Sequence, residues 1–399
     1  GENGSGKTSL LDAIAIALGV WLMDIPDAQI KNQRSFDKSE IRGRYVKSGD
    51  RAQYTPELDA RVTARGNIIR GEVTQWSREF VFGRRSNHLD DARRLIRSLY
   101  QQATAGEDVL LPVIAYYGAG RTWQAHRERR KKDSRTHKQS SRWAAFYDCL
   151  NERIRVNDLK RWFRSEETAR GRREGKYRPG FEVVRRAVMG CVPGADDVFF
   201  DPEMEDIVFS IDGNAQPSNN LSAGQRTMLA LVADIAIRAV TQNNFLVPPD
   251  ELPQEDHALP KVLAETPGVV LIDELDVHLH PRWQRRVVSD LKTTFPNMQF
   301  VCTTHSPQVV GEIPPDEIRL LDSQVETPKQ AFGMDSNWIL EVLMNAADRN
   351  NQVEQETGKI SELITAGEIE NAKEQIRHVR NEINGTSGDL DRAEALLER

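Results

Sequence analysis

Residues 1–8, Gly-Glu-Asn-Gly-Ser-Gly-Lys-Thr, fit the pattern G-x-x-x-x-G-K-[ST] at every position. In such a loop the glycines let the backbone curl, so that successive N–H groups point inward at a phosphate. Lys7 would place a charge between the β- and γ-phosphates, and Thr8 would offer its hydroxyl to Mg²⁺. The N-terminus of the following helix would add positive partial charge. The sequence therefore predicts a site for ATP and Mg²⁺ that includes Asn3, Gly4, Ser5, Gly6, Lys7 and Thr8.

Two acidic residues close the apolar run at 269–272, Val-Val-Leu-Ile. A buried strand ending at Asp273 would place this carboxylate beside the phosphate loop, where it can enter the Mg²⁺ shell. Glu274 would point elsewhere and could orient and deprotonate the attacking water. Such a pair alone is often only a solvated turn, but the preceding phosphate loop favours catalysis. His305 follows a second β run at 299–303 and could donate a hydrogen bond to the γ-phosphate.

The turn at 221–225, Leu-Ser-Ala-Gly-Gln, opens an apolar helix and is a second candidate anion site. Ser222 can donate its hydroxyl, Gly224 permits close backbone approach, and Gln225 completes the predicted nucleotide contacts. The phosphate loop already supplies such contacts within its own subunit. We therefore expect this turn to bind a γ-phosphate held by another subunit. ATP would then join two subunits head to tail in a homodimer or higher oligomer, and hydrolysis would release them.

The composition is that of an ordinary globular protein, with 39% hydrophobic and 29% charged residues in 399. The sequence contains no run of about eighteen apolar residues and no signal peptide, so no membrane partner is expected. Cys149, Cys191 and Cys302 fit neither a disulfide framework nor a metal-binding spacing, which favours the reducing cytoplasm. The net charge of −6 gives no overall signature of nucleic-acid binding.

The expected fold class is α/β, with a mixed-sheet core, a β-meander, a helical subdomain and a C-terminal helical tail. Helical spacing of apolar residues predicts a helix over 8–20, and alternation predicts a meander over 42–82. The two apolar runs at 269–272 and 299–303 are typical of buried parallel strands. Further expected elements are a helix at 88–104, a strand at 109–117, a helical stretch at 143–163, a strand hairpin at 199–211 with a turn at 212–213, an acidic Pro-rich loop at 243–265 and a helical hairpin at 360–383.

Three regions follow from these elements. The core is expected over 1–125 and 195–325, interrupted by a helical and basic insertion over 126–194. The tail is expected over 326–399. Because a phosphate loop normally leaves a buried strand, we expect the N-terminal strand of the core to lie upstream of Gly1.

Two basic segments stand out from the acidic average. Residues 126–142 contain eight Lys or Arg against two acids, and residues 169–178 contain five against one. Both are expected to be loops, either solvated linkers or surfaces that contact the phosphate backbone of nucleic acid.

Two further features leave alternatives open. The turn at 117–121, Tyr-Gly-Ala-Gly-Arg, is either a ligand position or a structural turn. His278 and His280 suggest a metal, but the missing acidic or cysteine partner at useful spacing favours a subunit-contact loop over zinc.

Taken together, 1–8, 221–225, 273–274 and His305 resemble the Walker A, signature, Walker B and switch-histidine motifs of ABC-type ATPases. The resemblance implies a P-loop fold of that type. The stretch at 276–281, Asp-Val-His-Leu-His-Pro, is similar to the RecF, SMC and OLD-nuclease branch and argues against a transporter subunit.

The strongest resemblance is to the PtuA-like ATPases of Septu and retron anti-phage systems. The segments that carry it lie at 115–121, 221–225, 272–281, 303–307 and 332–337. This resemblance implies a partner HNH nuclease that the ATP state restrains or licenses, although the sequence contains no nuclease motif. The alternative is a RecF-like DNA repair ATPase without a nuclease partner.

Overall fold

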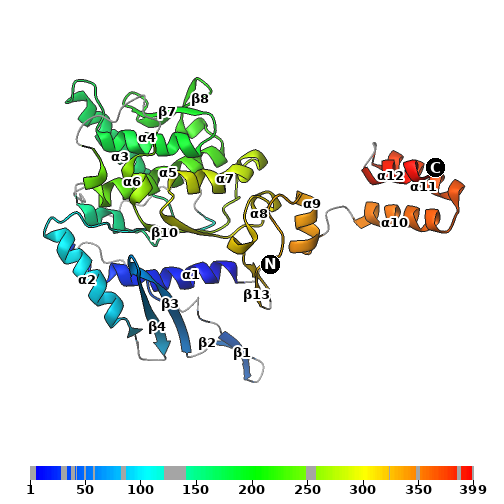
Figure 1. Cartoon of the computed structure of the whole chain (residues 1–399), viewed down its shortest axis with the longest axis horizontal. Coiled ribbons are helices and arrows are strands. Elements are labelled where there is room, and N and C mark those ends of the chain that lie inside the picture. Colours follow the sequence, from blue (N-terminus) through cyan, green and yellow to red (C-terminus); the bar gives the residue numbers. More distant parts are fainter. Residues whose placement is uncertain are drawn as a thin grey trace. The chain divides into compact units, whose positions relative to one another are not determined.

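The computed structural model describes residues 6–27, 34–36, 41, 43–48, 51–56, 59–81, 87–120, 141–248, 258–322, 324–346, 351–383 and 388–397. The chain divides into a larger unit, Asn3–Glu312, and a smaller unit that contains Ile313–Arg399. Figure 1 traces both units. The mixed α/β architecture of the described residues confirms the expected fold class.

The centre of the larger unit is a parallel sheet with the strand order β11–β10–β6. Its strands are β6 (Val113–Tyr117), β10 (Gly268–Ile272) and β11 (Met298–Cys302). Ile272 pairs with both Tyr117 and Cys302, so the three strands end level with one another. Every residue of β6 is buried, as expected for a parallel strand covered on both faces. The expected strand at 109–117 is shorter than predicted because 107–112 is irregular.

Helix α1 (Lys7–Leu18) continues into a 3₁₀ turn (Gly19–Leu22) and lies between the parallel sheet and the meander (Figure 1). The meander strands β3 (Asp59–Ile69) and β4 (Glu72–Val81) are antiparallel, and β4 also pairs with β5 (Asn87–His88). Trp76 Nε1 donates to Ala17 O at 3.0 Å, and Arg78 donates to Ile16 O at 2.8 Å. These bonds fix the C-terminal end of α1 on the meander. A separate hairpin is formed by β1 (Gly43–Ser48) and β2 (Arg51–Pro56).

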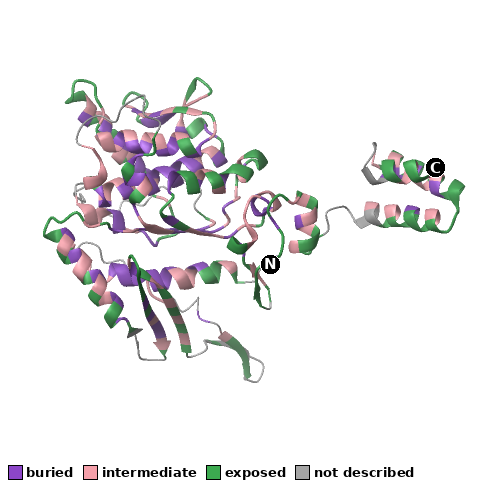
Figure 2. Ribbon diagram, in the orientation of Figure 1, coloured by how far each residue is buried: buried purple, intermediate pink, exposed green. Residues whose placement is uncertain are grey.

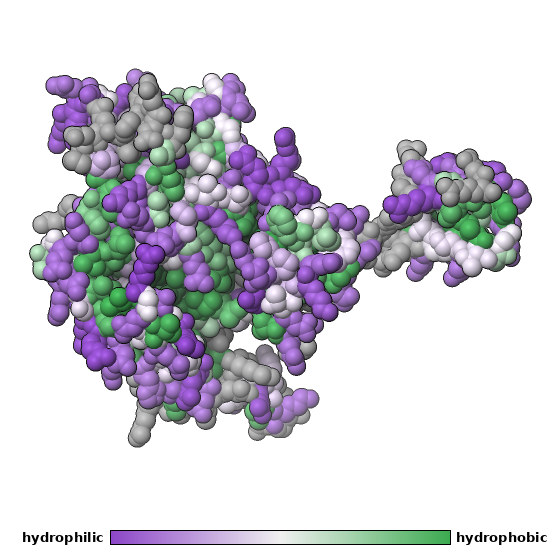
Figure 3. Space-filling model, viewed as in Figure 1, coloured by the Kyte–Doolittle hydropathy of each residue, from purple (hydrophilic) through white to green (hydrophobic). Residues whose placement is uncertain are grey.

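Helix α2 (Asp90–Thr104) packs against the meander and the 3₁₀ turn after α1. Tyr100 is 2% exposed and belongs to the same core cluster as Leu11 and Leu271. Figure 2 shows buried residues concentrated along α1, β10 and the long helix α5 (Ala223–Gln242). On the face drawn in Figure 3, hydrophobic residues are visible mainly near the middle of the larger unit, around α1 and β10.

The chain between β6 and α5 is first helical and then stranded. It contains a 3₁₀ turn (Arg142–Phe146), α3 (Val156–Gly171), α4 (Pro179–Cys191), β7 (Ala195–Asp201), β8 (Asp206–Ile211), β9 (Asn214–Pro217) and a 3₁₀ turn (Ser218–Asn220).

Two predictions within this part of the chain were wrong in detail. The helix expected at 143–163 is interrupted at 147–155. Its second part, α3, begins at Val156 and extends beyond the predicted end to Gly171. Three antiparallel strands replace the expected hairpin, and the turn at 212–213 joins β8 to β9. The positive φ of Asp212 (49°) and Gly213 (75°) suits that tight turn.

The rest of the larger unit is helical apart from β10 and β11. Its elements are a 3₁₀ turn (Asn244–Leu246), α6 (Lys261–Glu265), α7 (Pro281–Thr294) and α8 (Pro307–Val310). Helix α4 packs against both α5 and α7. The acidic stretch at 249–257 lies outside the described residues.

The smaller unit ends in the helical tail that its apolar spacing predicts. Its elements are a 3₁₀ turn (Pro315–Glu317), β12 (Leu320–Leu321), β13 (Val325–Glu326), α9 (Ser336–Trp338), a π turn (Ile339–Leu343), α10 (Asn351–Thr365), α11 (Ile369–Glu382) and α12 (Gly388–Leu397). Ile360, Ile376, Val379 and Leu390 form the core of the last three helices. Among the described residues, no helix has the length and apolar character needed to cross a membrane.

Candidate functional site

The candidate site is built where the three parallel strands end. The hydrogen-bond ladder continues one residue beyond β10, because Asp273 N donates to Tyr117 O at 2.8 Å. Thr303 N likewise donates to Ile272 O at 2.9 Å. The segments that follow β6, β10 and β11 therefore leave the sheet at one edge, which is the usual ligand-binding edge of an α/β sheet.

At this edge the structure brings Thr8 and Asp273 together. Thr8 Oγ1 donates to Asp273 Oδ2 at 2.9 Å, across 265 residues of sequence. Asp273 is only 4% exposed, and its other carboxylate oxygen accepts from Thr303 Oγ1 at 2.5 Å. A buried carboxylate requires such partners. Mg²⁺ prefers hard oxygen ligands, typically one or two carboxylates together with substrate phosphates, so this carboxylate beside a hydroxyl fits the ion.

The beginning of α1 suits a bound anion. Gly6 has φ of +85° and caps the helix without a side-chain hydrogen bond, and the first turn contains no acidic residue. The first N–H groups of a helix lack intrahelical partners and carry positive partial charge. A phosphate beside half-buried Lys7 would accept hydrogen bonds from these N–H groups and offset their positive partial charge. The remaining predicted loop residues, Asn3, Gly4 and Ser5, lie outside the described residues.

Thr303 was missed by sequence reasoning, although it connects the two acids that were predicted. Its hydroxyl donates to Asp273 and accepts from Glu274 N at 2.8 Å. Glu274 has φ of +49°, an uncommon conformation for a residue with a side chain. Such backbone conformations cost of order 1–3 kcal/mol and cluster at functional sites. A threonine directly after a strand that ends level with β10 was the available signal.

The loop that contains His305 is held by Asp276. Thr304 Oγ1 donates to Asp276 Oδ1 at 2.5 Å, and His305 N donates to the same oxygen at 3.2 Å. The His305 side chain is exposed. Ser306 Oγ donates to Gln284 Oε1 at 2.6 Å and caps α8 by accepting from Val309 N. The segment after Glu274 and the segment after β11 are therefore joined by hydrogen bonds.

The turn at 221–225 is ordered mainly by its own hydrogen bonds. Ser222 Oγ accepts from Gln225 N at 3.2 Å, and Gln225 Oε1 accepts from Ser222 N at 2.9 Å. This reciprocal capping box fixes the N-terminus of α5. Ser222 is exposed, and an accepting hydroxyl still has its hydrogen to donate. The Gln225 amide oxygen, predicted to contact nucleotide, is engaged in the cap.

Gly224 explains the close packing of this turn on the segment 278–279. A Cβ at Gly224 would lie 2.4 Å from His278 O. His278 adopts a positive φ of 65°, and His280 Nδ1 accepts from Arg282 N at 3.3 Å at the start of α7. Both histidines therefore shape the loop that faces α5. Within the described part of the chain, no group of three or more His, Cys, Asp or Glu side chains could hold a metal ion.

The end of β6 is held against α5 by a cluster of polar side chains. Tyr117 Oη donates to Asp234 Oδ2 at 2.7 Å, and Arg238 Nε donates to the same oxygen at 2.7 Å. Burial raises the pKa of Tyr117 well above its ordinary value, and the Asp234 carboxylate raises it further. A Cβ at Gly118 would lie 2.7 Å from the Glu152 side chain. These contacts give the first residues of the turn at 117–121 a structural role, while Arg121 lies outside the described residues.

Comparison with protein families identifies two matching regions. A family described as an AAA domain matches residues 1–170. A second, described as an AAA domain, putative AbiEii toxin, Type IV TA system, matches residues 192–311.

Similar proteins include retron and Septu components. The chain is 36% identical over 169 residues to the Retron Ec83 probable ATPase of Escherichia coli, covering 42% of this chain and 29% of that protein. It is 25% identical over 371 residues to the Retron Vc95 probable ATPase of Vibrio cholerae serotype O1 biovar El Tor. This alignment covers 81% of this chain and 68% of that protein. The chain is 32% identical over 146 residues to the Septu protein PtuA of Bacillus mycoides (strain KBAB4). This alignment covers 35% of this chain and 17% of that protein.

These proteins differ from this chain in extent, since the chain spans less than a third of the Ec83 protein and about two thirds of the Vc95 protein. The two AAA matches cover both sides of the candidate site, from the phosphate loop to the segment after His305. The chain is therefore similar to AAA-domain ATPases, and its similar proteins include retron ATPases and Septu PtuA proteins.

Proposed function

We propose that the chain binds and hydrolyses ATP with Mg²⁺ between two copies of itself, so that the ATP state controls their association. One copy would contribute Lys7, Thr8 and Asp273, and the other would contribute the turn at 221–225. The observation that carries this proposal is the exposed N-terminus of α5, which its capping box orders in advance. An ordered, exposed helix N-terminus can receive a phosphate presented by another molecule.

The residues at the sheet edge divide the chemistry between them. Thr8 and Asp273 would hold Mg²⁺, whose charge offsets that of the phosphates. Glu274 would orient the attacking water and accept its proton, and the His305 side chain would donate to the γ-phosphate. Thr303 contacts both the metal-binding carboxylate and the backbone of the base, so it positions the two residues relative to each other.

The Glu274→Gln substitution tests this proposal. Loss of a general base typically slows a reaction about 10²–10⁴-fold, so the variant should retain ATP and accumulate as an ATP-dependent dimer in light scattering. Lys7→Ala is the matched control and should remain monomeric at the same ATP concentration. Hydrolysis by Glu274→Gln at the wild-type rate would refute the base assignment. A variant that binds ATP but stays monomeric would contradict the shared site.

We further propose that the chain is the ATPase component of a cytoplasmic anti-phage complex that controls a partner HNH nuclease. The names of the retron and Septu relatives support the role of an ATPase in such a system. The HNH nuclease partner is what the resemblance to the PtuA-like ATPases implies. A RecF-like DNA repair ATPase without a nuclease partner is the alternative. Purification of the native complex separates them: recovery of an HNH nuclease whose activity changes with ATP favours the first. DNA-stimulated hydrolysis without any co-purifying nuclease favours the second.

A further inference from the structure

An arginine-lined groove lies along α3, and none of its lining residues belongs to the proposed ATP site. It has a volume of about 450 Å³. The residues that line it include five arginines and no acidic residue. They are Arg161, Arg164, Ser165, Thr168, Ala169, Arg172, Arg173 and Arg178.

The helical period of α3, continued to its C-cap residue Arg172, places three of these arginines on one side. Leu159 and Phe163 are buried on its inner side, whereas Arg161, Arg164 and Arg172 are exposed. Spacings of three, eight and eleven residues keep these three side chains on one face of a helix. At 1.5 Å per residue, the distance from Arg161 to Arg172 is about 16 Å along the axis. The basic segment expected as a loop at 169–178 therefore begins in α3, and its arginines continue a row that starts earlier in the helix.

The arginines of the groove are only partly neutralised. Arg161 pairs with Asp158 at 3.1 Å, and Arg164 pairs with Glu205 at 3.3 Å. Glu205 is well exposed and Asp158 is half-buried, while both arginines are exposed. Ion pairs at the surface contribute little stability, so an incoming anion could replace these carboxylates. Within the described residues, no carboxylate forms an ion pair with Arg172.

Arg173 likewise has no ion pair among the described residues, whereas Arg178 has a structural partner. Arg178 lies 3.2 Å from Glu166, which is 5% exposed. Burial raises the pKa of the Glu166 carboxyl, and the charges of Arg178 and, to a smaller extent, Arg173 oppose that shift. Arg172 is thus the groove arginine whose charge is most available to a ligand, followed by Arg173, which acts on Glu166 without forming an ion pair with it.

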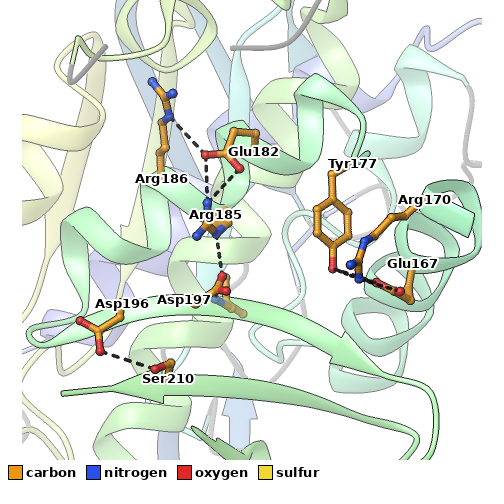
Figure 4. Close-up of polar contacts among 10 residues, drawn as sticks. Glu167, Arg170, Tyr177, Glu182, Arg185, Arg186, Asp196, Asp197 and Ser210 are labelled. Carbon is orange, nitrogen blue, oxygen red and sulfur yellow. Dashed lines mark hydrogen bonds and ion pairs between the residues drawn. The ribbon is translucent and has the colours of Figure 1, made fainter. Parts of the chain in front are cut away.

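Arginines that serve only to stabilise neighbouring elements are bound differently. Figure 4 shows Arg185 of α4 between Glu182 and Asp197. The same view shows Arg170, whose guanidinium bonds to Glu167 at 3.0 Å and stacks over Tyr177. Carboxylates within the fold neutralise the charges of Arg185 and Arg170, whereas among the described residues no carboxylate forms an ion pair with Arg172 or Arg173.

We propose that the α3 groove binds the phosphate backbone of a nucleic acid. Guanidinium groups match phosphate oxygens as planar, bidentate donors. Charges spread over about 16 Å exceed the reach of one phosphate but match several phosphates of a strand, which are about 3.4 Å apart along a duplex axis. This site goes beyond the proposed ATP switch, because it requires neither nucleotide nor hydrolysis.

The test compares two double variants that lose the same charge. Arg172→Gln with Arg173→Gln removes two groove charges, and Arg65→Gln with Arg94→Gln removes two exposed arginines from β3 and α2. Binding of fluorescent single-stranded DNA, duplex DNA and RNA is measured for the full-length protein without ATP. Each lost phosphate contact lowers the salt exponent by about 0.9. Between about 50 and 200 mM salt, the wild-type affinity should therefore fall roughly tenfold more than that of the groove variant.

The outcomes separate this site from other ligands and from the ATP switch. The control variant should retain the wild-type salt dependence, and Lys7→Ala should bind nucleic acid normally even though it lacks ATP binding. Absence of wild-type binding at low salt, or an unchanged salt slope in the groove variant, would overturn the proposal. Equal competition by inorganic phosphate or ATP, at matched phosphate concentration, would assign a small anion instead. Equal binding of polyglutamate would assign an acidic protein segment.

Discussion

Thr303→Val removes the hydroxyl that connects Asp273 to Glu274 while keeping the size of the side chain. Thr303 is 9% exposed, so water cannot readily replace the lost partner. The Thr303 hydroxyl donates one hydrogen bond to the Asp273 carboxylate and accepts another from the backbone N–H of Glu274. Bonds to charged groups contribute about 1.5–3 kcal/mol and neutral bonds about 0.5–1.5 kcal/mol. We expect the free energy of unfolding to fall by about 2–4 kcal/mol.

The effect on activity should exceed the effect of lost stability. Partners that orient a metal-binding carboxylate typically contribute 10–100-fold in metal affinity or activity. ATP turnover is measured against Mg²⁺ concentration at a temperature where urea titration shows the variant to be folded. We expect about 10–100-fold lower turnover with a raised Mg²⁺ requirement.

Thr303→Ser is the matched control, because it retains the hydroxyl and loses only a methyl group. It should remain close to wild type in Mg²⁺ dependence. If Thr303→Val matches the wild type in both stability and turnover, the hydroxyl does not position Asp273 and Glu274. If Thr303→Ser and Thr303→Val lose stability and turnover equally, the hydrogen bonds are not the cause. The loss would then be due to side-chain packing alone.

Three further predictions concern single residues. Gly224→Ala places a methyl group against His278 O, so it should cost about 1–3 kcal/mol in urea unfolding and lower ATP turnover; an unchanged variant would contradict the close packing. Lys7→Ala should abolish ATP binding in calorimetry, and retained affinity would remove Lys7 from the site. A hydrogen bond from Arg93 lowers the pKa of Asp24 below its usual 3.8, so its stabilisation is complete above that pH and is lost as pH falls through the lowered pKa. The stability advantage of wild type over Asp24→Asn should therefore shrink below about pH 4, and a pH-independent difference would contradict this linkage.

The sheet and the Thr8–Asp273 contact follow from patterns that the sequence carries locally. Four apolar residues closed by two acids predict where β10 ends, and the phosphate-loop pattern predicts where α1 begins. Parallel strands that end level then place the following residues at one edge. The core fold was therefore predictable from short motifs, without knowledge of distant contacts.

The polar contacts between loops were not predictable in this way. The bonds of Asp276 to Thr304 and His305 join residues almost thirty positions apart and depend on the register of β10 against β11. Gln225 was expected at the nucleotide, and its spacing from Ser222 also fits the capping box that the structure shows. Its contact with nucleotide stays a prediction. The end of α3 was misplaced because its outer face is so basic that the run resembles a loop.

Complementation between two inactive variants tests the shared ATP site most directly. Ser222→Arg blocks the turn that one copy would present, and Lys7→Ala disables the phosphate loop of the other. In a mixed dimer, one of the two sites combines an intact phosphate loop with an intact turn. Neither variant can form a complete site with a second copy of itself, so ATP should favour mixed dimers with one complete site each. Up to about half of the wild-type ATP turnover should therefore return if the sites act independently. A mixture as inactive as either parent, although mixed dimers form, would contradict a site shared between copies.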